Sequence, residues 1–394
     1  MRTGTPGFVG ARLREVREVR QLPQMALAEM AGVSPQAISN YERDQSSPSP
    51  ETLSRIIDVL NVPPHFLTLP ARNSTGRKIF YRSMSSATKG ARDRAEHRTG
   101  WLNDIADYAS EFVELPRVNI PDFDVPVDPL QLASDDIEHI AAEARAHWNM
   151  RDQPIGDVVS LLENQGIVVG RDRLGAVTLD SLSGMSEEAQ HPVVLIGTDK
   201  GTPVRWRFDG AHELGHLILH KNLDERRPRN LAEHKEIETQ AHRFAAAFLL
   251  PSDSFSEELY AATLDAMLAM KPRWRTSVGM MITRAKQTNM ISEAVEKRLW
   301  INYSRRGWRR REPLDDSMHH ERPNVLRKSL ELILQAGAQS VQDVIDGTGL
   351  PPSDIEALAG LKPGFLSDGF VQVELRRESE WPSNVTPIRR FAQP

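Results

Sequence analysis

The sequence predicts a mainly α-helical protein with a mixed α+β centre. Three observations predict this class. Apolar residues recur at helical spacing through the first 70 residues, short apolar runs typical of strands gather between residues 167 and 198, and helical spacing returns after residue 255. A chain of 394 residues is too long for one ordinary core, so we expect two or three domains.

The composition excludes several classes of protein. A net charge of −5 excludes a uniformly basic nucleic-acid coat, so any DNA binding must come from a local surface. The chain has no cysteine, which excludes disulfides, thiolate metal sites and cysteine nucleophiles. No stretch reaches the roughly 20 apolar residues of a membrane span, and the N-terminus lacks the apolar core of a signal peptide. We therefore expect a cytoplasmic protein with no membrane partner.

Short helices are predicted in the first 70 residues. The segment 24–33 ends at Gly32, which permits a left-handed turn, and Ser34 caps the next helix with Pro35 at its first position. A further helix over 47–62 carries a regular apolar face.

Residues 22–43, "LPQMALAEMAGVSPQAISNYER", have the form of a helix-turn-helix. The second helix would enter a DNA major groove by its N-terminal part. Gln36 and Asn40 lie four residues apart on one face, and each can pair with adenine. Gln24 and Arg43 suit phosphate oxygens. The alternative from periodicity alone is a small helical bundle with a solvated Gln/Asn face.

The stretch "GVSPQAISNYERDQSSPSPETLSRIIDVLNV" resembles the XRE (Cro-like) family of helix-turn-helix domains, and the likeness covers most of residues 8–67. It implies a DNA-binding domain over 1–70 that binds a double-stranded DNA operator as a homodimer. Asp44 stands where the family has a turn glycine, and Asp tolerates the left-handed conformation. The domain carries seven basic and seven acidic side chains, so one copy would bind DNA weakly.

Residues 71–130 are predicted to be a basic linker followed by an amphipathic helix. Residues 71–100 hold eight Lys and Arg against two acids, which indicates either a solvated linker or a surface near DNA phosphates. The helix is expected over 101–115, and a proline-bearing run closes the segment near residue 130.

The α+β centre is predicted over residues 131–260. Helices are expected over 135–150 and 154–166, followed by short strands and turns at 167–170, 176–180, 184–188 and 192–198. Two more helices, 207–220 and 237–250, are each largely apolar on one side.

The first of these two helices contains "HELGH", residues 212–216. Residues four apart share a helix face, so His212 and His216 can direct two imidazoles at one Zn²⁺. Glu213 projects beside them, where it can act as a general base on water. The motif fixes only three positions, and the alternative is a helix with two ordinary polar histidines.

A zinc site needs a third protein ligand, and the candidates are His220, His234, Glu238 and His242. His220 lies near the helix end, too far along for the same ion. The longer metal-binding spacing that ends in a third histidine is absent, because Leu219 and Asn222 occupy the positions that it requires. Glu238 lies on the second amphipathic helix and suits a set of two histidines and one glutamate.

"RWRFDGAHELGHLILH" followed by "IETQAHRFAAAFLLP" resembles the ImmA/IrrE metallopeptidase family, over residues 135–255 or so. The resemblance implies a zincin-like domain in which His212, His216 and Glu238 bind Zn²⁺ and Glu213 is the catalytic base. His242 stands where the family usually has Asn, so it either contacts the metal or lies behind the ligands. Asp209-Gly210 also departs from the pattern.

Three residues are candidates for stabilising the oxyanion of the reaction, namely His242, Tyr260 and Arg207. Residues 261–394 are predicted to be a helical extension, which resembles the extension of longer fusions of these two families. Its tryptophans 274, 300 and 308 lie near arginines, which suits either stacking on nucleic acid or cation–π packing at a protein surface.

These features together predict a DNA-binding transcriptional regulator with a zinc-dependent peptidase domain. The family resemblance implies a repressor-like protein as substrate, in stress, phage or mobile-element control. Two alternatives are a regulator whose peptidase-like domain only senses a ligand or metal, and an antitoxin-like or defence module that acts by protein binding. An intact set of ligands and base favours the peptidase, since a sensor has no need of the base.

Overall fold

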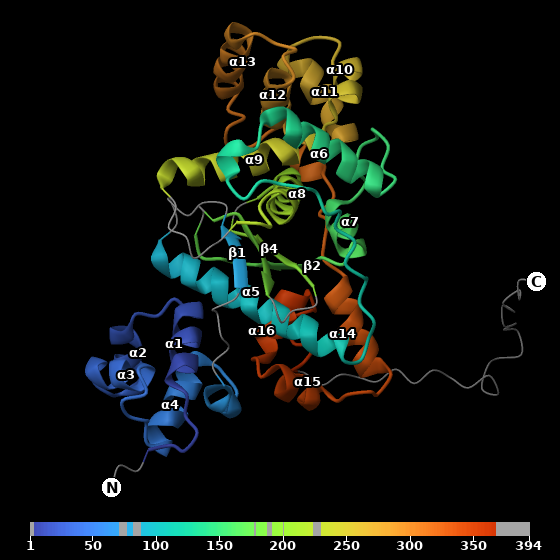
Figure 1. The fold of residues 1–394 in the computed structure, drawn as a ribbon. Helices are drawn as coiled ribbons and strands as arrows, with labels where there is room; N and C mark the ends of the chain where they lie inside the picture. The colour runs from blue at the N-terminus through green and yellow to red at the C-terminus, as the bar shows by residue number, and fades with distance from the viewer. Residues whose placement is uncertain are drawn as a thin grey trace, which may run out of the picture.

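The structure is a computed structural model. It describes residues 4–70, 77–81, 88–176, 179–186, 191–199, 201–223 and 230–367, with the side chains of 77–81 and 185–186 left out of the description. Part of the predicted basic linker, residues 71–76 and 82–87, therefore lies outside the described residues. The rest forms helices stacked on both faces of one small sheet (Figure 1). The predicted class, mainly α with an α+β centre, is confirmed.

The N-terminal helices are α1 (Gly10–Val19), α2 (Gln24–Ala31), α3 (Pro35–Glu42), α4 (Pro50–Leu60) and the 3₁₀ turn η1 (Pro64–Thr68). The local signals act as expected. Gly32 ends α2 with φ of 66°, and Ser34 Oγ accepts a hydrogen bond from Ala37 N at 3.1 Å. Asp44 has φ of 56°, the left-handed conformation that its position requires, and its carboxylate accepts from Gly10 N at 2.6 Å.

One helix, α5 (Lys89–Ser110), runs beneath the sheet and contacts most of the lower half of the molecule. The sequence predicts a helix only over 101–115. The structure begins it twelve residues earlier, because Ala91 and Ala95 give the first turns a buried face of small side chains that apolar periodicity scarcely marks. Upstream of it, β1 (Arg77–Tyr81) is a strand where a linker was expected.

The sheet has the order β1-β3-β4-β2, with β2 (Val168–Asp172), β3 (Ser181–Ser186) and β4 (Val193–Gly197). β1 and β4 each pair antiparallel with β3, and β2 runs parallel to β4. The strand expected at 176–180 forms later, from Ser181, while residues 177–178 and 187–190 lie outside the described part. Alternate residues of β4 enter different cores, as a strand covered on both faces requires.

Above the sheet lie the helices of the α+β centre, which are η2 (Pro129–Gln131), α6 (Ser134–His147), α7 (Val158–Asn164), α8 (Pro203–Leu219) and α9 (Leu231–Leu249). α8 packs directly on β3 and β4, and α9 crosses α8 on its far side (Figure 1). This arrangement places the "HELGH" helix between the sheet and a second buried helix.

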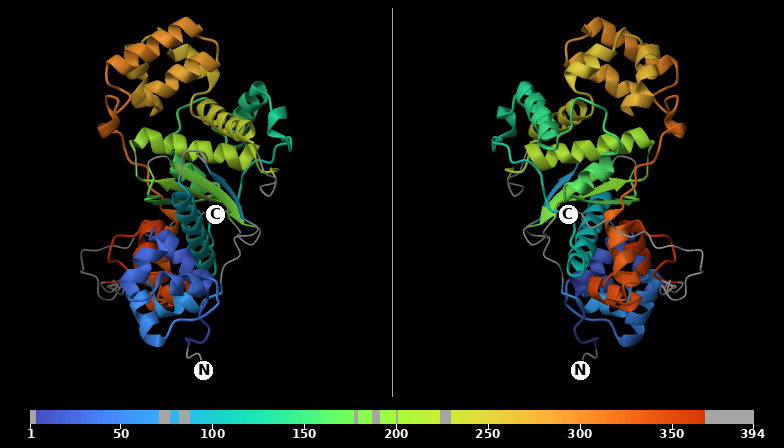
Figure 2. Two further views of the ribbon diagram at one scale, coloured as in Figure 1. Left: turned by 90° about the vertical axis from the view of Figure 1, so that its left-hand side faces the viewer. Right: turned by 90° about the vertical axis from the view of Figure 1, so that its right-hand side faces the viewer.

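The helices after α9 divide between two places. The upper group packs on α9 around a core of its own and comprises α10 (Ser252–Glu258), α11 (Leu264–Trp274), α12 (Val278–Gln287) and α13 (Glu293–Arg305). The lower group lies beside α1–α4 and against α5, as both side views show (Figure 2), and comprises α14 (Val325–Gln335), α15 (Val341–Thr348) and α16 (Pro352–Ala359). A short 3₁₀ turn, η3 (Asp315–Ser317), lies between the groups.

The lower group shares one core with the helix-turn-helix and α5. Asp354 of α16 accepts hydrogen bonds from Arg20, which directly follows α1, at 2.7 Å, and from Arg98 of α5. Arg98 also donates to Asp172 at the end of β2, at 2.5 Å. The N-terminal domain is therefore joined to the rest of the molecule by packing and buried ion pairs. None of the described helices is long and apolar enough to cross a membrane.

Candidate metal centre and DNA-reading helix

The candidate metal centre lies where α8 and α9 touch. Gly215 makes the close approach possible, because a Cβ at that position would lie 3.1 Å from Phe244 Cδ1 and 3.3 Å from Ala241 O on α9. His212 and His216, one turn apart on α8, both face α9 and are buried. Glu238 reaches the same point from α9 with a quarter of its side chain exposed.

The donor atoms of these three side chains converge. His212 Nε2 and His216 Nε2 are 3.0 Å apart. Glu238 Oε2 lies 3.5 Å from His212 Nε2, and Glu238 Oε1 lies 3.5 Å from His216 Nε2. Ligands placed tetrahedrally at zinc's bond length of about 2.0–2.1 Å are about 3.3 Å from one another. The spacing of the three donors therefore fits a tetrahedral zinc ion.

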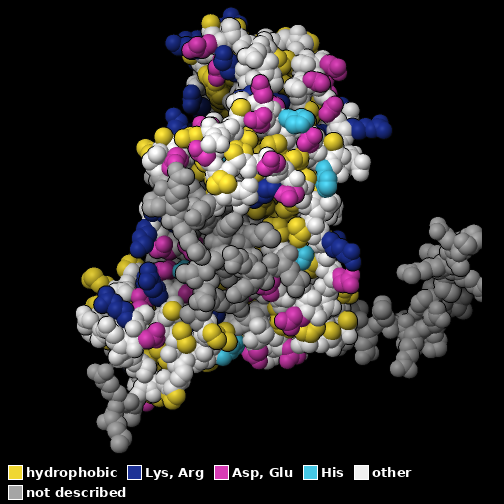
Figure 3. All heavy atoms as spheres, in the orientation of Figure 1, with side chains coloured by type: hydrophobic (Ala, Val, Ile, Leu, Met, Phe, Trp, Pro, Cys, Tyr) yellow, Lys and Arg dark blue, Asp and Glu magenta, His cyan; other side chains and the backbone are white. Residues whose placement is uncertain are grey.

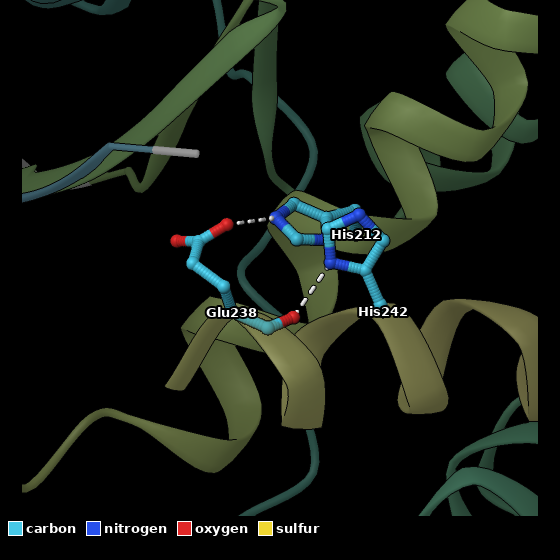
Figure 4. A group of neighbouring side chains, drawn as sticks. All are labelled: His212, Glu238 and His242. Carbon is cyan, nitrogen blue, oxygen red and sulfur yellow. Dashed lines mark hydrogen bonds and ion pairs between the residues drawn. The ribbon is translucent and has the colours of Figure 1, made fainter. Parts of the chain in front are cut away.

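His242 belongs to the same cluster. Its ring centroid is 4.5 Å from that of His212, and ligand atoms of His212, Glu238 and His242 lie within 4.8 Å of one another (Figure 4). Its Nδ1 is 2.6 Å from the Glu238 carbonyl oxygen, which only accepts, so Nδ1 carries the proton. In the neutral ring, Nε2 is then the nitrogen through which His242 could bind a metal or a substrate.

A chain of hydrogen bonds fixes the orientation of His216. Gln240 Nε2 donates to Pro129 O at 2.6 Å, so Gln240 Oε1 must accept from His220 Nε2, 3.1 Å away. His220 Nδ1, 2.9 Å from His216 Nδ1, is then the acceptor of that contact in the neutral ring. His216 carries its proton on Nδ1, and its Nε2 lone pair points into the cluster, the arrangement that a histidine ligand needs.

Glu213 is fully buried beside the cluster, on the side of the sheet. Ser181 Oγ of β3 donates to Glu213 Oε1 at 2.6 Å. Burial raises the pKa of Glu213 above its usual range, against the opposing effects of His216 and the Ser181 hydroxyl. A carboxylate held in this way is a stronger base than one in water, which suits the role predicted for it.

Two of the three candidates for stabilising an oxyanion do not join the histidine–glutamate cluster. Arg207 is buried and bound to Glu321 and to the carbonyl oxygen of Ile155, so its guanidinium ties α8 to the segment before α14. Tyr260 is 81% exposed. His242 is the candidate that the structure brings to the cluster.

From the sequence, His220 is considered only as a third metal ligand and set aside, and Gln240 and Ser181 are not indicated as parts of this site. The spacing of His220 from His216 was the one available signal, since it places both rings on one face of α8. Gln240 and Ser181 carry no local signal, because their roles depend on how α9 and β3 pack against α8.

The DNA-reading candidates lie on and beside α3, which occupies the outer side of the N-terminal domain (Figure 1). Gln36 Nε2 donates to Asn40 Oδ1 at 2.9 Å on the exposed face, and Arg43 is exposed just after the helix. Gln24 donates to Glu42 Oε2 at 2.6 Å, which holds its amide at the start of α2. The predicted inward residue Ile38 is fully buried.

Comparison with known families agrees with both parts of the chain. Residues 13–67 match the helix-turn-helix family, and residues 162–286 match the IrrE N-terminal-like domain, a peptidase family. The first match contains α2 and α3, and the second contains α8, α9 and the histidine–glutamate cluster. No curated protein matches the chain significantly. The chain therefore joins an XRE-type helix-turn-helix domain to an IrrE N-terminal-like domain of the peptidase type.

Proposed function

We propose that the chain is a DNA-binding transcriptional regulator whose central domain hydrolyses a peptide bond in a repressor-like protein, with Zn²⁺ as its cofactor. The observation that carries this proposal is the convergence of His212, His216 and Glu238 at zinc-like spacing next to a buried general base, Glu213.

The reaction assigns a separate task to each residue. His212 and His216 would hold a zinc ion through Nε2, and Glu238 would hold it through its carboxylate. When bound, zinc supplies the Lewis acidity that lets a water lose a proton near neutral pH and become a nucleophile for an amide. Glu213 accepts a proton from that water and then delivers it to the leaving amine. The Ser181 hydroxyl holds Glu213, and the helix packing around it excludes bulk water.

The proposed role of the helix-turn-helix is to bring the peptidase domain to a DNA operator. In this proposal Gln36 and Asn40 read bases in the major groove, while Gln24 and Arg43 contact phosphates. A homodimer on a two-fold operator would place two α3 helices one turn of DNA apart. The packing of this domain on α5 would then hold the peptidase beside proteins bound at the same operator, in the cytoplasm.

The test is a comparison of wild-type protein with Glu213→Gln. Both are loaded with zinc, incubated with candidate repressor proteins from the same genome and analysed by mass spectrometry. We expect both to hold about one zinc per chain, and hydrolysis by the variant to fall by about 100-fold or more, because only the base is lost. Equal hydrolysis by the two proteins would refute the role of Glu213. If the wild-type protein does not retain zinc, the result would favour a module that acts by binding and not by hydrolysis.

A further inference from the structure

A cleft of about 950 Å³ opens directly beside the metal centre. Phe208 and His242 line its inner end, with their ring centroids 5.5 Å apart, and His242 touches the ring of His212. Its walls come from the start of α8, from α9 and α12, and from α13 with the segment that follows it. The cleft therefore connects the proposed catalytic residues with the upper helical group.

The outer wall carries positive charge. Arg309 and Arg310 are exposed and line the cleft, directly after α13. Arg309 Nε donates to Ser304 Oγ at 2.6 Å. Within the described part of the chain, neither arginine has a carboxylate oxygen within 4.0 Å, as an ion pair would require. Figure 3 shows Lys and Arg side chains gathered over α13 at the upper left of the molecule.

The acidic side chains that line the same cleft already have partners within the protein. Glu312 and Asp315 are buried, and each accepts from Lys271 Nζ at 2.6 Å. Glu312 also accepts from the amides of Val278 and Gly279 at the start of α12. Asp316, the third acid, pairs with Arg311. Lys271 offsets only one of the two buried carboxylates, but Arg309 and Arg310 together outweigh the other, so the cleft keeps a net positive charge.

The aromatic side chains of this wall are engaged inside the protein. Tyr303 and Trp308 are only 8% and 9% exposed, and they pack edge to face on each other. The Tyr303 hydroxyl donates to Glu312 at 2.8 Å. Trp300, the third ring of this wall, is partly exposed, packs edge to face on Tyr303 and donates to Glu296 at 3.4 Å. Trp274 lies outside the cleft lining and is 1% exposed. A wall with one partly exposed ring suits a peptide better than a run of stacked bases.

We propose that this cleft binds an acidic segment of the protein substrate, whose Asp or Glu carboxylates pair with Arg309 and Arg310 while the neighbouring peptide bond lies at the metal centre. This inference rests on the proposed peptidase function and names a preference of that site. Both arginines lie outside residues 162–286, the part that matches the peptidase family. The upper helical group therefore selects the substrate for the catalytic helices.

The test measures peptide binding in the full-length chain with zinc and the Glu213→Gln substitution, which prevents turnover. The probes are two short fluorescein-labelled peptides of equal length, one with runs of Asp and Glu around an apolar centre, the other with Asn and Gln in their place. We expect fluorescence anisotropy to show tighter binding of the acidic peptide. Replacing both arginines, Arg309→Ala with Arg310→Ala, should weaken its binding by about tenfold or more.

The matched control is Arg298→Ala with Arg305→Ala, which removes the same charge from exposed positions of α13 outside the cleft. It should bind the acidic peptide as tightly as the parent. Reversing the charge with Arg309→Glu and Arg310→Glu should switch the preference to a peptide with Lys runs, which only a folded cleft can do.

Three results would overturn the proposal. They are equal binding of the acidic and neutral peptides, equal losses in the cleft variant and its control, and tighter binding of a single-stranded oligonucleotide through the same two arginines. The proposed function fails separately. If zinc-loaded wild-type protein cleaves no peptide but the acidic peptide still needs Arg309 and Arg310, the chemistry is rejected and the binding site stands.

Discussion

The two ring nitrogens of His216 have different partners, and this difference decides what the residue can do. Nε2 faces His212 and Glu238, whereas Nδ1 contacts His220, which is held by Gln240. The carbonyl oxygen of Pro129 is the last acceptor in this series of hydrogen bonds, so it fixes which group donates in each of them. His220 is thus a positioning residue for His216, at one remove from any metal.

Replacing His220 tests that positioning role. His220→Ala should leave the three donors in place but free the His216 ring to rotate, which lowers zinc affinity by about 10–100-fold. Competition with a chromogenic chelator measures the affinity. His139→Ala is the control, because it removes a histidine whose side chain is 72% exposed on α6. An affinity equal to that of the control would show that His216 needs no such support.

Two variants test which α9 side chain, Glu238 or His242, is a zinc ligand. Glu238→Ala should lower zinc affinity by more than the roughly 10–100-fold typical of residues behind the ligands, because it removes a direct donor. His242→Ala should retain about one zinc per chain. Metal analysis after dialysis distinguishes them. Zinc retained by the first variant and lost from the second would exchange the two assignments.

At the scale of the element, local sequence signals fix the start of α3 and the turn that follows it. Ser34 caps it, and the left-handed Asp44 ends the turn that follows and binds the start of α1. Gln36 and Asn40 bond to each other on the exposed face. In the proposed complex with DNA, this hydrogen bond would be exchanged for contacts with bases.

Asn40→Ala should weaken binding to a specific operator by roughly 1–3 kcal/mol and change binding to random DNA little, because a base contact is lost and no phosphate contact. Titrations at two salt concentrations, on an operator obtained by genomic selection, measure both. Gln342→Ala on α15 is the control, since it removes another exposed amide with a partner four residues away. Equal losses on specific and random DNA would remove Asn40 from base reading.

Elements with strong local signals were predictable from the sequence, and elements defined by tertiary contacts were not. Caps and turns located α2 and α3, and the four-residue spacing of His212 and His216 predicted that they share a helix face, with Glu213 beside them. By contrast, β1 is a strand because β3 offers it an edge, and its own sequence reads as a charged linker. The position of Arg309 and Arg310 in the wall of the cleft beside the metal centre likewise depends on where α13 packs.

At the scale of the whole molecule, the helix-turn-helix is fastened to α5 by a charged contact at its surface. Glu18 of α1 accepts from Arg14 at 2.8 Å and lies 3.0 Å from His97 Nε2 of α5. Burial opposes ionisation, but the hydrogen bonds from His97 and Arg14 prevail and lower the pKa of Glu18 to about 2 from its usual 4.5.

This shift predicts a pH dependence of stability. Because the folded pKa lies below the unfolded one, the contribution of Glu18 is fully present above about pH 4.5 and is lost as the pH falls towards 2. Partial exposure reduces it to about 1–2 kcal/mol. The difference in urea-unfolding free energy between wild type and Glu18→Gln should therefore be largest near neutral pH and shrink on acidification. A difference that stays constant with pH would contradict this assignment.

The ion pairs around Asp354 also set an order of events during synthesis. Arg20 and Asp354 are 334 residues apart in the chain, so a ribosome that adds about 5–20 residues per second makes Asp354 roughly 20–70 s after Arg20. During the later part of that interval α1 and α5 have been made, but the helices that complete their core have not. The face of α5 that carries Arg98 and Tyr108 is then exposed in the nascent chain, and the helix-turn-helix domain reaches its final environment only after the IrrE N-terminal-like domain has been made.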